Sequence, residues 1–304
     1  MAIFYRIYDN NIRHAFETDK LGFDINEPSY IPDEYLENKK FIVLRTCNSL
    51  GDWGIISAMP RLLKKKYPDC KVYVPSVNLL TNMFAGRNTW NQWDNPFNNV
   101  AQIFHNNPWV DGFIDNIDDE VFHDHYRIYD LDNPEVPLVK QMLKFWQFTD
   151  SEMEDYLPEI YFTNEEIQLG NDIINHYIGD NVFGSLLLTN TTKDYYEDNV
   201  NKLLVDSLEL YKDLPFFYYG SKDINETMFN FVNVKGNFKD IEIPLRVQLY
   251  IKARAIVNIG YHSGINDILC RYTDVICTPM QPTSKETLRE NYLHTIKYLR
   301  YDFH

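Results

Sequence analysis

The sequence predicts an α/β protein with two doubly wound domains, and three observations support this prediction. Short apolar, β-branched runs alternate with amphipathic segments of helix length, which is typical of parallel sheets covered by helices. The segment "DYLPEIYFTNEE" separates two such series and is the best candidate for a linker. A length of 304 residues suits two domains. We therefore expect Rossmann-like domains at residues 1–163 and 164–304 that face a central cleft.

The first βαβ unit should follow an irregular extension at residues 1–39, which shows no sustained period. Residues 41–45 form an apolar run of strand length. One face of a helix is then predicted by the spacing of Ile55, Ile56, Met59, Leu62, Leu63 and Tyr67. The three lysines at 64–66 should end this helix, and "KVYV" is a second strand. The loop "NSLGDWG" thus lies at the carboxyl end of a parallel strand, where open α/β sheets bind ligands.

Further elements complete the N-terminal domain. "AQIFHNNPWVDGFID" predicts a helix end or strand with a turn at "NNP", "HYRIYDLD" a strand that ends in acids, and "QMLKFWQF" a helix. "HDH" at 123–125 and "DLD" at 130–132 imitate metal-binding motifs, but no further cluster supports a metal site. We expect no metal, and we interpret Asp130 and Asp132 as acids of an acceptor cleft or as solvated turn residues.

The C-terminal domain repeats the alternation. "NEEIQLGNDIINHYIG" predicts a helix that is capped by Asn164 and followed by Gly179. The expected strands are "SLLLTN", "PFFYYGS", "AIVNIG" and, as the last one, "DVICTPM". The expected helices are "VNKLLVDSLELYKDL", "IPLRVQLYIKAR" and "GINDILCRY". "SKETLRENYLHTIKYL" predicts a terminal helix, which could cross back to the first domain.

The composition disfavours several functional classes. No apolar run approaches the ~18 residues of a membrane span. The N-terminus has no signal-peptide pattern, and four scattered cysteines without a CxxC pair suit a reducing cytosol, so we expect a cytoplasmic protein. The net charge of −15 disfavours nucleic acid as the main partner, although a local basic groove could lie within an acidic total.

The common phosphate-binding motifs are missing. The first loop contains only Gly51 and Gly54 and not GxGxxG, and the chain contains no GxxxxGK[ST] segment. Dinucleotide-dependent hydride transfer and P-loop phosphoryl transfer are therefore disfavoured.

Two blocks of the sequence resemble the heptosyltransferase-like family of GT-B glycosyltransferases, which includes the ADP-heptose transferases of lipopolysaccharide. They are "LRTCNSLGDWGIISAMPRLLKKKYPDCKVYV" and "IPLRVQLYIKARAIVNIGYHSGINDILCRYTDVICTPMQPTS". With weaker blocks between them, the resemblance covers roughly residues 40–285. The chain departs from the family at His262, where Asp is usual, at Asp267, where His is usual, and after Lys193, where a tryptophan is missing.

The resemblance implies a GT-B fold in which the C-terminal domain holds a nucleoside-diphosphate-sugar and the N-terminal domain presents the acceptor. It implies that the donor is bound by Thr191, Thr192, Lys193, Gly220, His262, Ser263, Gly264 and Asn266. We expect Ser49, Gly51, Asp130 and Asp132 on the acceptor side. A diphosphate is favoured at a helix N-terminus that follows a strand, and Lys193 would add a counter-charge. The nucleotide-sugar is a co-substrate, and no cofactor is expected.

Asp52 is the candidate catalytic residue. Transfer to a hydroxyl needs a base for its proton, and Asp52 lies at a strand end of the opposite domain. Since no second carboxylate is positioned as a nucleophile, we expect direct displacement with inversion. The structural alternative is that Asp52 only caps the helix after its loop. Similarly, His262 could bind its own loop, Lys193 could be a solvated lysine, and Ser263 could only form a turn.

The sequence therefore predicts a metal-independent glycosyltransferase whose acceptor is a glycan or a lipid-linked saccharide. One alternative acceptor is a hydroxylated base in DNA, as in some viral glycosyltransferases, and a basic groove would distinguish it. Another alternative is a non-catalytic module that binds a nucleotide-sugar, which the changes at His262 and Asp267 favour.

Overall fold

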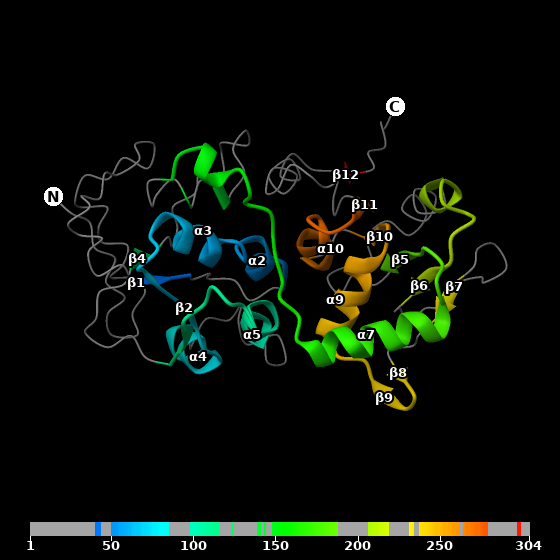
Figure 1. The fold of residues 1–304 in the computed structure, drawn as a ribbon, viewed down its shortest axis with the longest axis horizontal. Helices are drawn as coiled ribbons and strands as arrows, with labels where there is room; N and C mark the ends of the chain where they lie inside the picture. Colours follow the sequence, from blue (N-terminus) through cyan, green and yellow to red (C-terminus); the bar gives the residue numbers. More distant parts are fainter. Residues whose placement is uncertain are drawn as a thin grey trace. The chain divides into compact units, whose positions relative to one another are not determined.

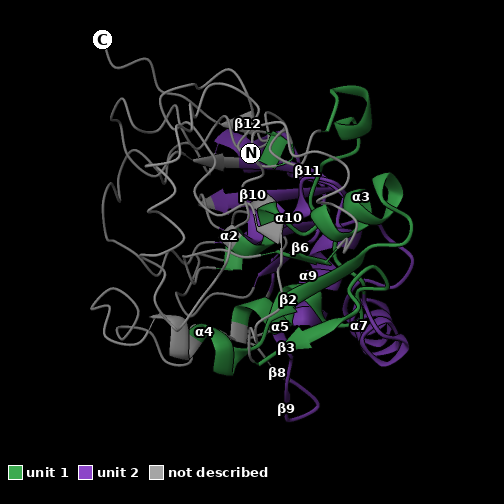
Figure 2. Cartoon of the chain, turned by 90° about the vertical axis from the view of Figure 1, so that its left-hand side faces the viewer, with its two compact units in different colours: residues 1–161, 291–293 green, residues 162–290, 294–304 purple. Residues whose placement is uncertain are grey.

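A computed structural model gives the fold of two compact units, which meet in the chain between Tyr161 and Phe162, two residues before the predicted boundary (Figures 1 and 2). The structure describes residues 40–43, 50–84, 98–115, 123–124, 139–140, 143, 148–187, 206–218, 231–233, 237–261, 264–278 and 297–298. Each unit has its own parallel sheet with packed helices, which confirms the predicted α/β class. The extension at 1–39 lies outside the described residues.

The sheet of the first unit has the strand order β3-β2-β1-β4, and all its pairs are parallel. Its strands are β1 (Lys40–Ile42), β2 (Lys71–Pro75), β3 (Gly112–Ile114) and β4 (His123–Asp124). Its helices are α2 (Leu50–Ile55), α3 (Met59–Lys66), α4 (Val77–Phe84) and α5 (Asn98–Phe104), and η3 (Ser151–Met153) is a 3₁₀ turn. Figure 1 shows α3 and α4 on opposite faces of this sheet. Of the two alternatives predicted for "AQIFHNNPWVDGFID", the helix end is confirmed: α5 ends at Phe104, a turn follows, and β3 comes after it.

The predicted single helix of the first βαβ unit is two helices. A turn at residues 56–58 separates α2 from α3, and Pro60 lies in the first turn of α3. Proline has no N–H to donate, so it favours a helix start at this point. The predicted apolar face is nevertheless buried from Ile55 to Leu63.

The lysines at the end of α3 bind acids of the same unit. α3 ends at Lys66, as predicted. Lys64 Nζ lies 2.6 Å from Asp111 Oδ2, and Lys66 Nζ lies 2.8 Å from Glu152 Oε2. Burial tends to raise the pKa of Asp111, but the hydrogen bonds from Lys64, the Val72 N–H and Lys71 outweigh it and lower that pKa.

The sheet of the second unit has the order β12-β11-β10-β5-β6-β7, again with parallel pairs. Its strands are β5 (Gly184–Leu187), β6 (Phe216–Tyr218), β7 (Phe231–Asn233), β10 (Val257–Tyr261), β11 (Asp274–Thr278) and β12 (Lys297–Tyr298). Its helices include α7 (Asn164–Tyr177), α9 (Leu245–Arg254) and α10 (Gly264–Leu269). A hairpin, β8 (Asn237–Phe238) with β9 (Ile241–Glu242), was not expected, nor was β7.

Two details of the second unit correct the sequence-based expectations. Thr163, not Asn164, is the N-cap of α7: its Oγ1 accepts from the Glu166 N–H, and the Glu166 carboxylate accepts from the Thr163 N–H. This reciprocal capping box satisfies two donors at once. Gly179 follows the helix end with φ +65°, as predicted.

The prediction of a terminal helix is wrong at residues 297–298, which form β12, and "DVICTPM" is therefore not the last strand. β12 pairs parallel to β11, with Ile276 opposite Lys297. An unpaired strand edge presents backbone donors and acceptors to any available segment, and local periodicity does not reveal this pairing. Residues 284–296 lie outside the described residues. The helix predicted over 200–214 is helical at 206–209 and turns at 210–213.

Among the described residues of the second unit, two basic side chains are buried. Arg246 donates to Glu166, with Nε 2.6 Å from Oε1, so Glu166 both caps α7 and holds α9. Lys252 of α9 is buried, and its Nζ donates to Ser185 Oγ at 2.7 Å. Within the described residues, none of the helices has the length and hydrophobicity that crossing a bilayer requires.

The stability of the second unit should depend on pH through Lys252. Burial lowers the pKa of Lys252 from 10.5 to about 7. Between these values the unfolded chain binds more protons than the folded one, so the free energy of unfolding should rise with pH, by up to about 1.4 kcal/mol per unit. Denaturant unfolding at pH 7, 8 and 9 measures this slope. Lys252→Met should flatten it, whereas Lys212→Met, at an exposed position, should not. An unchanged slope in Lys252→Met would contradict the assignment.

Candidate functional site

Asp52 lies in the first turn of α2, beyond the carboxyl end of β1. α2 begins at Leu50, so Asp52 is its third residue and not part of a preceding loop, as the sequence had suggested. Asp52 is thus in the first turn, where its carboxylate would still stabilise the helix dipole, and not at the N-cap position, so a structural role stays the alternative to a catalytic one. Gly51 is buried beside it, and the side chain of Asp52 is outside the described part of the structure. Asp52 therefore remains at the edge where open α/β sheets bind ligands.

Three polar residues at the neighbouring strand ends were missed by the sequence analysis: Ser76, Asn78 and Asp115, here called the strand-end trio. The Ser76 hydroxyl donates to Asp115 Oδ1 at 2.6 Å, and Asn78 Nδ2 donates to the same oxygen at 3.3 Å. Ser76 Oγ also accepts from the Leu79 N–H at 3.1 Å, which caps α4. Ser76 and Asp115 directly follow β2 and β3. Polar residues immediately after strands are visible in the sequence, so these two residues could have been identified as site candidates from it.

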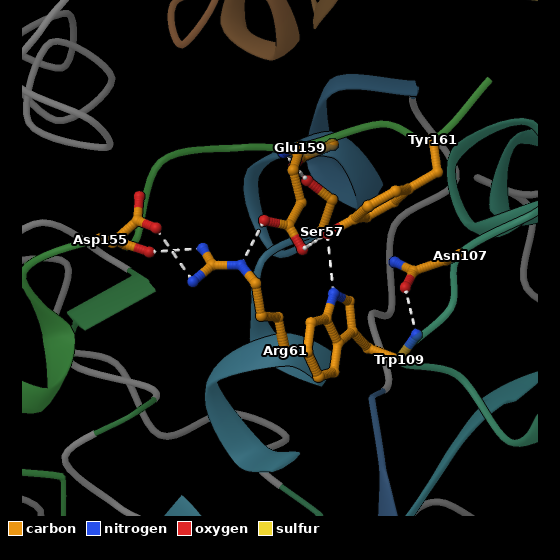
Figure 3. Close-up of polar contacts among 8 residues, drawn as sticks. Ser57, Arg61, Asn107, Trp109, Asp155, Glu159 and Tyr161 are labelled. Atoms are coloured by element: carbon orange, nitrogen blue, oxygen red, sulfur yellow. Dashed lines mark hydrogen bonds and ion pairs between the residues drawn. The ribbon is translucent and has the colours of Figure 1, made fainter. Parts of the chain in front are cut away.

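A buried polar network supports the end of α2 (Figure 3). The Ser57 hydroxyl donates to the Gly54 carbonyl at 2.6 Å and accepts from the Glu159 N–H at 2.7 Å. The Glu159 carboxylate accepts from Arg61 Nε at 2.6 Å. Arg61 also donates to the Asp155 carbonyl at 2.7 Å and pairs with the Asp155 carboxylate at 3.0 Å. Residues far apart in the chain thus hold the turn between α2 and α3.

The same network continues to an aromatic pair. The Tyr161 hydroxyl donates to Glu159 Oε1 at 3.0 Å and accepts from Trp109 Nε1 at 2.8 Å. Burial and the negative charge of Glu159 raise the pKa of Tyr161 to about 12, so its hydroxyl stays protonated. Asn107 Oδ1 accepts from the Trp109 N–H at 2.9 Å. Because these groups bind one another, we assign the network to positioning α2 and not to chemistry.

The second unit has the predicted strand, loop and helix at β10 and α10. β10 ends at Tyr261 and α10 begins at Gly264, while the intervening His262 and Ser263 lie outside the described residues. Asn266 is buried in α10. At Gly260 a Cβ atom would collide with the Leu187 carbonyl oxygen, so only glycine allows β5 and β10 this approach at their carboxyl ends.

The structure does not test the remaining predicted site residues. The residues outside its described part are Ser49, Asp130, Asp132, Thr191, Thr192, Lys193, Gly220, His262 and Ser263. Within that part, no group of three or more His, Cys, Asp or Glu residues could hold a metal ion. β4 contains His123 and Asp124, the first two residues of the "HDH" motif.

Comparison with known proteins finds similarity in structure alone. No family model matches the chain, and no curated sequence matches it significantly. A glycosyl transferase family 9 protein from Veillonella parvula aligns with a TM-score of 0.52 at 9% identity over 86% of this chain and 85% of that one. ADP-heptose LPS heptosyltransferase II from E. coli aligns with a TM-score of 0.49 at 12% identity over 88% and 91%. The first match confirms the predicted fold, which the chain shares with a glycosyl transferase across both units.

The buried Arg61–Glu159 pair should contribute more to stability than the exposed part of the same network. Glu159→Gln keeps the shape of the side chain but leaves the buried guanidinium with only the half-exposed Asp155 carboxylate as an ionic partner, so we expect a loss of about 3 kcal/mol. Asp155→Asn is the matched control, because the Asp155 side chain is 52% exposed, and it should lose less than about 1 kcal/mol. Denaturant unfolding compares them, and equal losses would refute the distinction.

Gly260→Ala should disturb the carboxyl edge of the second sheet. The added methyl group meets a backbone oxygen, which cannot rotate away, so a loss of about 1–3 kcal/mol is expected. Gly112→Ala in β3 is the control, since its Cβ would lie 4.0 Å from the nearest atom, Tyr73 Cδ1, and should be tolerated. Thermal and denaturant unfolding of both variants test this, and a stable Gly260→Ala protein would mean that the strands can separate.

Proposed function

We propose that this protein is a glycosyltransferase that moves a sugar from a nucleoside-diphosphate-sugar to a hydroxyl group of a glycan or a lipid-linked saccharide. The observation that carries the proposal is the structural alignment over both units with a family 9 glycosyl transferase. The two blocks around "SLGD" and "YHSG" support it independently, because in the chain they follow β1 and β10 and lead into α2 and α10.

The donor is proposed to bind to the second unit. Its diphosphate would meet backbone N–H groups near Gly264 at the start of α10, with Lys193 as counter-charge. Thr191, Thr192, Gly220, His262, Ser263 and Asn266 complete the proposed donor site. Small residues allow the phosphates to approach the backbone. β5 and β10, which precede the two proposed donor loops in the chain, are neighbouring strands in close contact at Gly260.

The reaction is proposed as a single displacement without a metal. The acceptor oxygen forms a bond to the anomeric carbon while the bond from that carbon to the diphosphate oxygen breaks. Asp52 takes the proton of the acceptor hydroxyl, and the nucleoside diphosphate leaves with the bonding electrons. This order inverts the anomeric configuration. A product with retained configuration, observed by NMR, would exclude it.

The strand-end trio is proposed to bind the acceptor. Asp115 is exposed and keeps Oδ2 for further hydrogen bonds, while Ser76 and Asn78 bind its other oxygen. A carboxylate oxygen that can accept hydrogen bonds from hydroxyl groups suits a polyhydroxylated ligand. The Ser76 hydroxyl proton is used in its bond to Asp115, but Asn78 Nδ2 has a second N–H that can donate to a ring or glycosidic oxygen.

Asp52→Asn tests the catalytic proposal. A thermal-shift screen of nucleotide-sugars first identifies the donor, because a ligand at 100 times its dissociation constant adds about 2.7 kcal/mol of stability. Asn cannot accept the proton, so turnover should fall by ~10²–10⁴-fold while the donor affinity and melting temperature barely change. Asp69→Asn, an exposed acid after α3, is the control and should remain active. An active Asp52→Asn protein would show that Asp52 is not the general base. A wild-type protein that binds the donor but neither transfers nor hydrolyses its sugar would instead be the non-catalytic binding module.

Asp115→Asn tests the acceptor site. A charge-assisted hydrogen bond contributes about 1.5–3 kcal/mol to binding. Its loss should therefore raise the KM for the acceptor about 10-fold or more. The KM for the donor and the rate of donor hydrolysis should not change. Glu154→Gln, an exposed acid of the same unit, serves as the control. If Asp115→Asn lowers kcat alone, the trio does not bind the ground-state acceptor.

A further inference from the structure

α2, the helix that contains Asp52, is too short to hold its position by itself. It has six residues, and two of them are the glycines Gly51 and Gly54. Isolated helices of fewer than ~12 residues are marginal in water, and glycine weakens them further. Apart from Leu50, every residue of α2 whose burial the structure describes is buried. The position of α2 therefore depends on how these residues pack within the first unit.

Trp53 is the largest apolar anchor of this helix. It follows Asp52 directly in the chain, and it is the largest fully buried side chain in the described part of the protein. Its ring meets the ring of Phe104, the last residue of α5, edge to face, with 6.4 Å between the centroids and 85° between the planes. Phe104 is buried as well, so the contact lies inside the core. Trp53 thus holds α2 against α5 next to the proposed base.

The indole N–H of Trp53 does not contribute to this anchoring. Trp53 Nε1 is buried, and among the described residues no hydrogen-bond acceptor lies within its reach. A buried donor without an acceptor lowers stability, and phenylalanine would fill an apolar position without this cost. What tryptophan supplies here is therefore the size of the indole, which packs more surface into the core than a phenyl ring does.

We propose that Trp53 is a positioning residue for Asp52, an inference that rests on the proposed transfer reaction. The two residues are neighbours in one short helix, with Cα atoms ~3.8 Å apart, so a change in the packing of the indole displaces the backbone of Asp52. A general base must lie within hydrogen-bonding distance of the proton that it takes. An error of ~1 Å in such a position can lower a rate ~100-fold. Trp53 itself is too deeply buried to touch either substrate.

Trp53→Phe separates positioning from stability. The variant leaves a gap where the second ring was, but it also removes the unpaired N–H, so its two effects on stability oppose each other. We expect kcat for sugar transfer to fall ~10–100-fold, because the base is displaced. The KM for the donor should not change, because the donor is proposed to bind to the second unit. Steady-state kinetics and thermal unfolding measure these effects.

Phe148→Leu is the matched control. Phe148 is a buried aromatic residue of the same unit, and it lies beside Lys66 at the end of α3, away from α2. This variant should lower the melting temperature by at least as much as Trp53→Phe does, while its kcat stays close to that of the wild type. A Trp53→Phe protein with the wild-type kcat overturns the inference. So does a Phe148→Leu protein whose kcat falls equally, because any loss of packing in the unit would then have the same effect.

Hydrogen exchange tests the anchoring of α2 without any substrate. In Trp53→Phe the amide protons of α2 should exchange at least ~10-fold faster than in the wild type, whereas those of β10 in the second unit should keep their rates, because exchange reports local opening. Unchanged exchange in α2 overturns the inference. If the wild-type protein transfers no sugar, the proposed function fails, and the exchange rates still decide whether the indole holds α2. An active wild-type protein with a fully active Trp53→Phe variant contradicts this inference alone.

Discussion

Parallel strand pairing is the constraint on which both units of this protein depend. Parallel neighbours cannot be joined by a tight hairpin, so each connection crosses the sheet and every carboxyl end arrives at the same edge. In the first unit this edge carries the start of α2, with Asp52, and the strand-end trio. In the second unit it carries the loop between Tyr261 and Gly264. The proposed site residues therefore owe their positions to strand order and not to proximity in the chain.

The same constraint creates the opposite edge, where the chain enters the strands. These entry segments are short in the second unit, so apolar residues such as Val182 and Ile256 remain exposed beside charged ones.

Buried charges hold the chain on both sides of the unit boundary. Glu159 is bound by Arg61 in the first unit, and Glu166 is bound by Arg246 in the second. Each carboxylate has a second partner, Tyr161 for Glu159 and the Thr163 N–H for Glu166. Buried ion pairs contribute little net stability compared with apolar packing, but they tolerate few alternative geometries. We infer that these pairs specify how the boundary segment joins each unit.

The sequence by itself determined the elements whose signals are local. The apolar period located β1, α3, α9 and β10, and the turn chemistry of Gly179 located the end of α7, because these signals act over a few residues. Only the tertiary structure decided what depends on distant partners. The pairing of β12 needs the edge of β11, and the support of α2 needs Glu159, which lies 102 residues from Ser57. Ser57 and Glu159 carry no joint pattern in the sequence, because the free energy of their contact arises only after the fold of the first unit has brought them together.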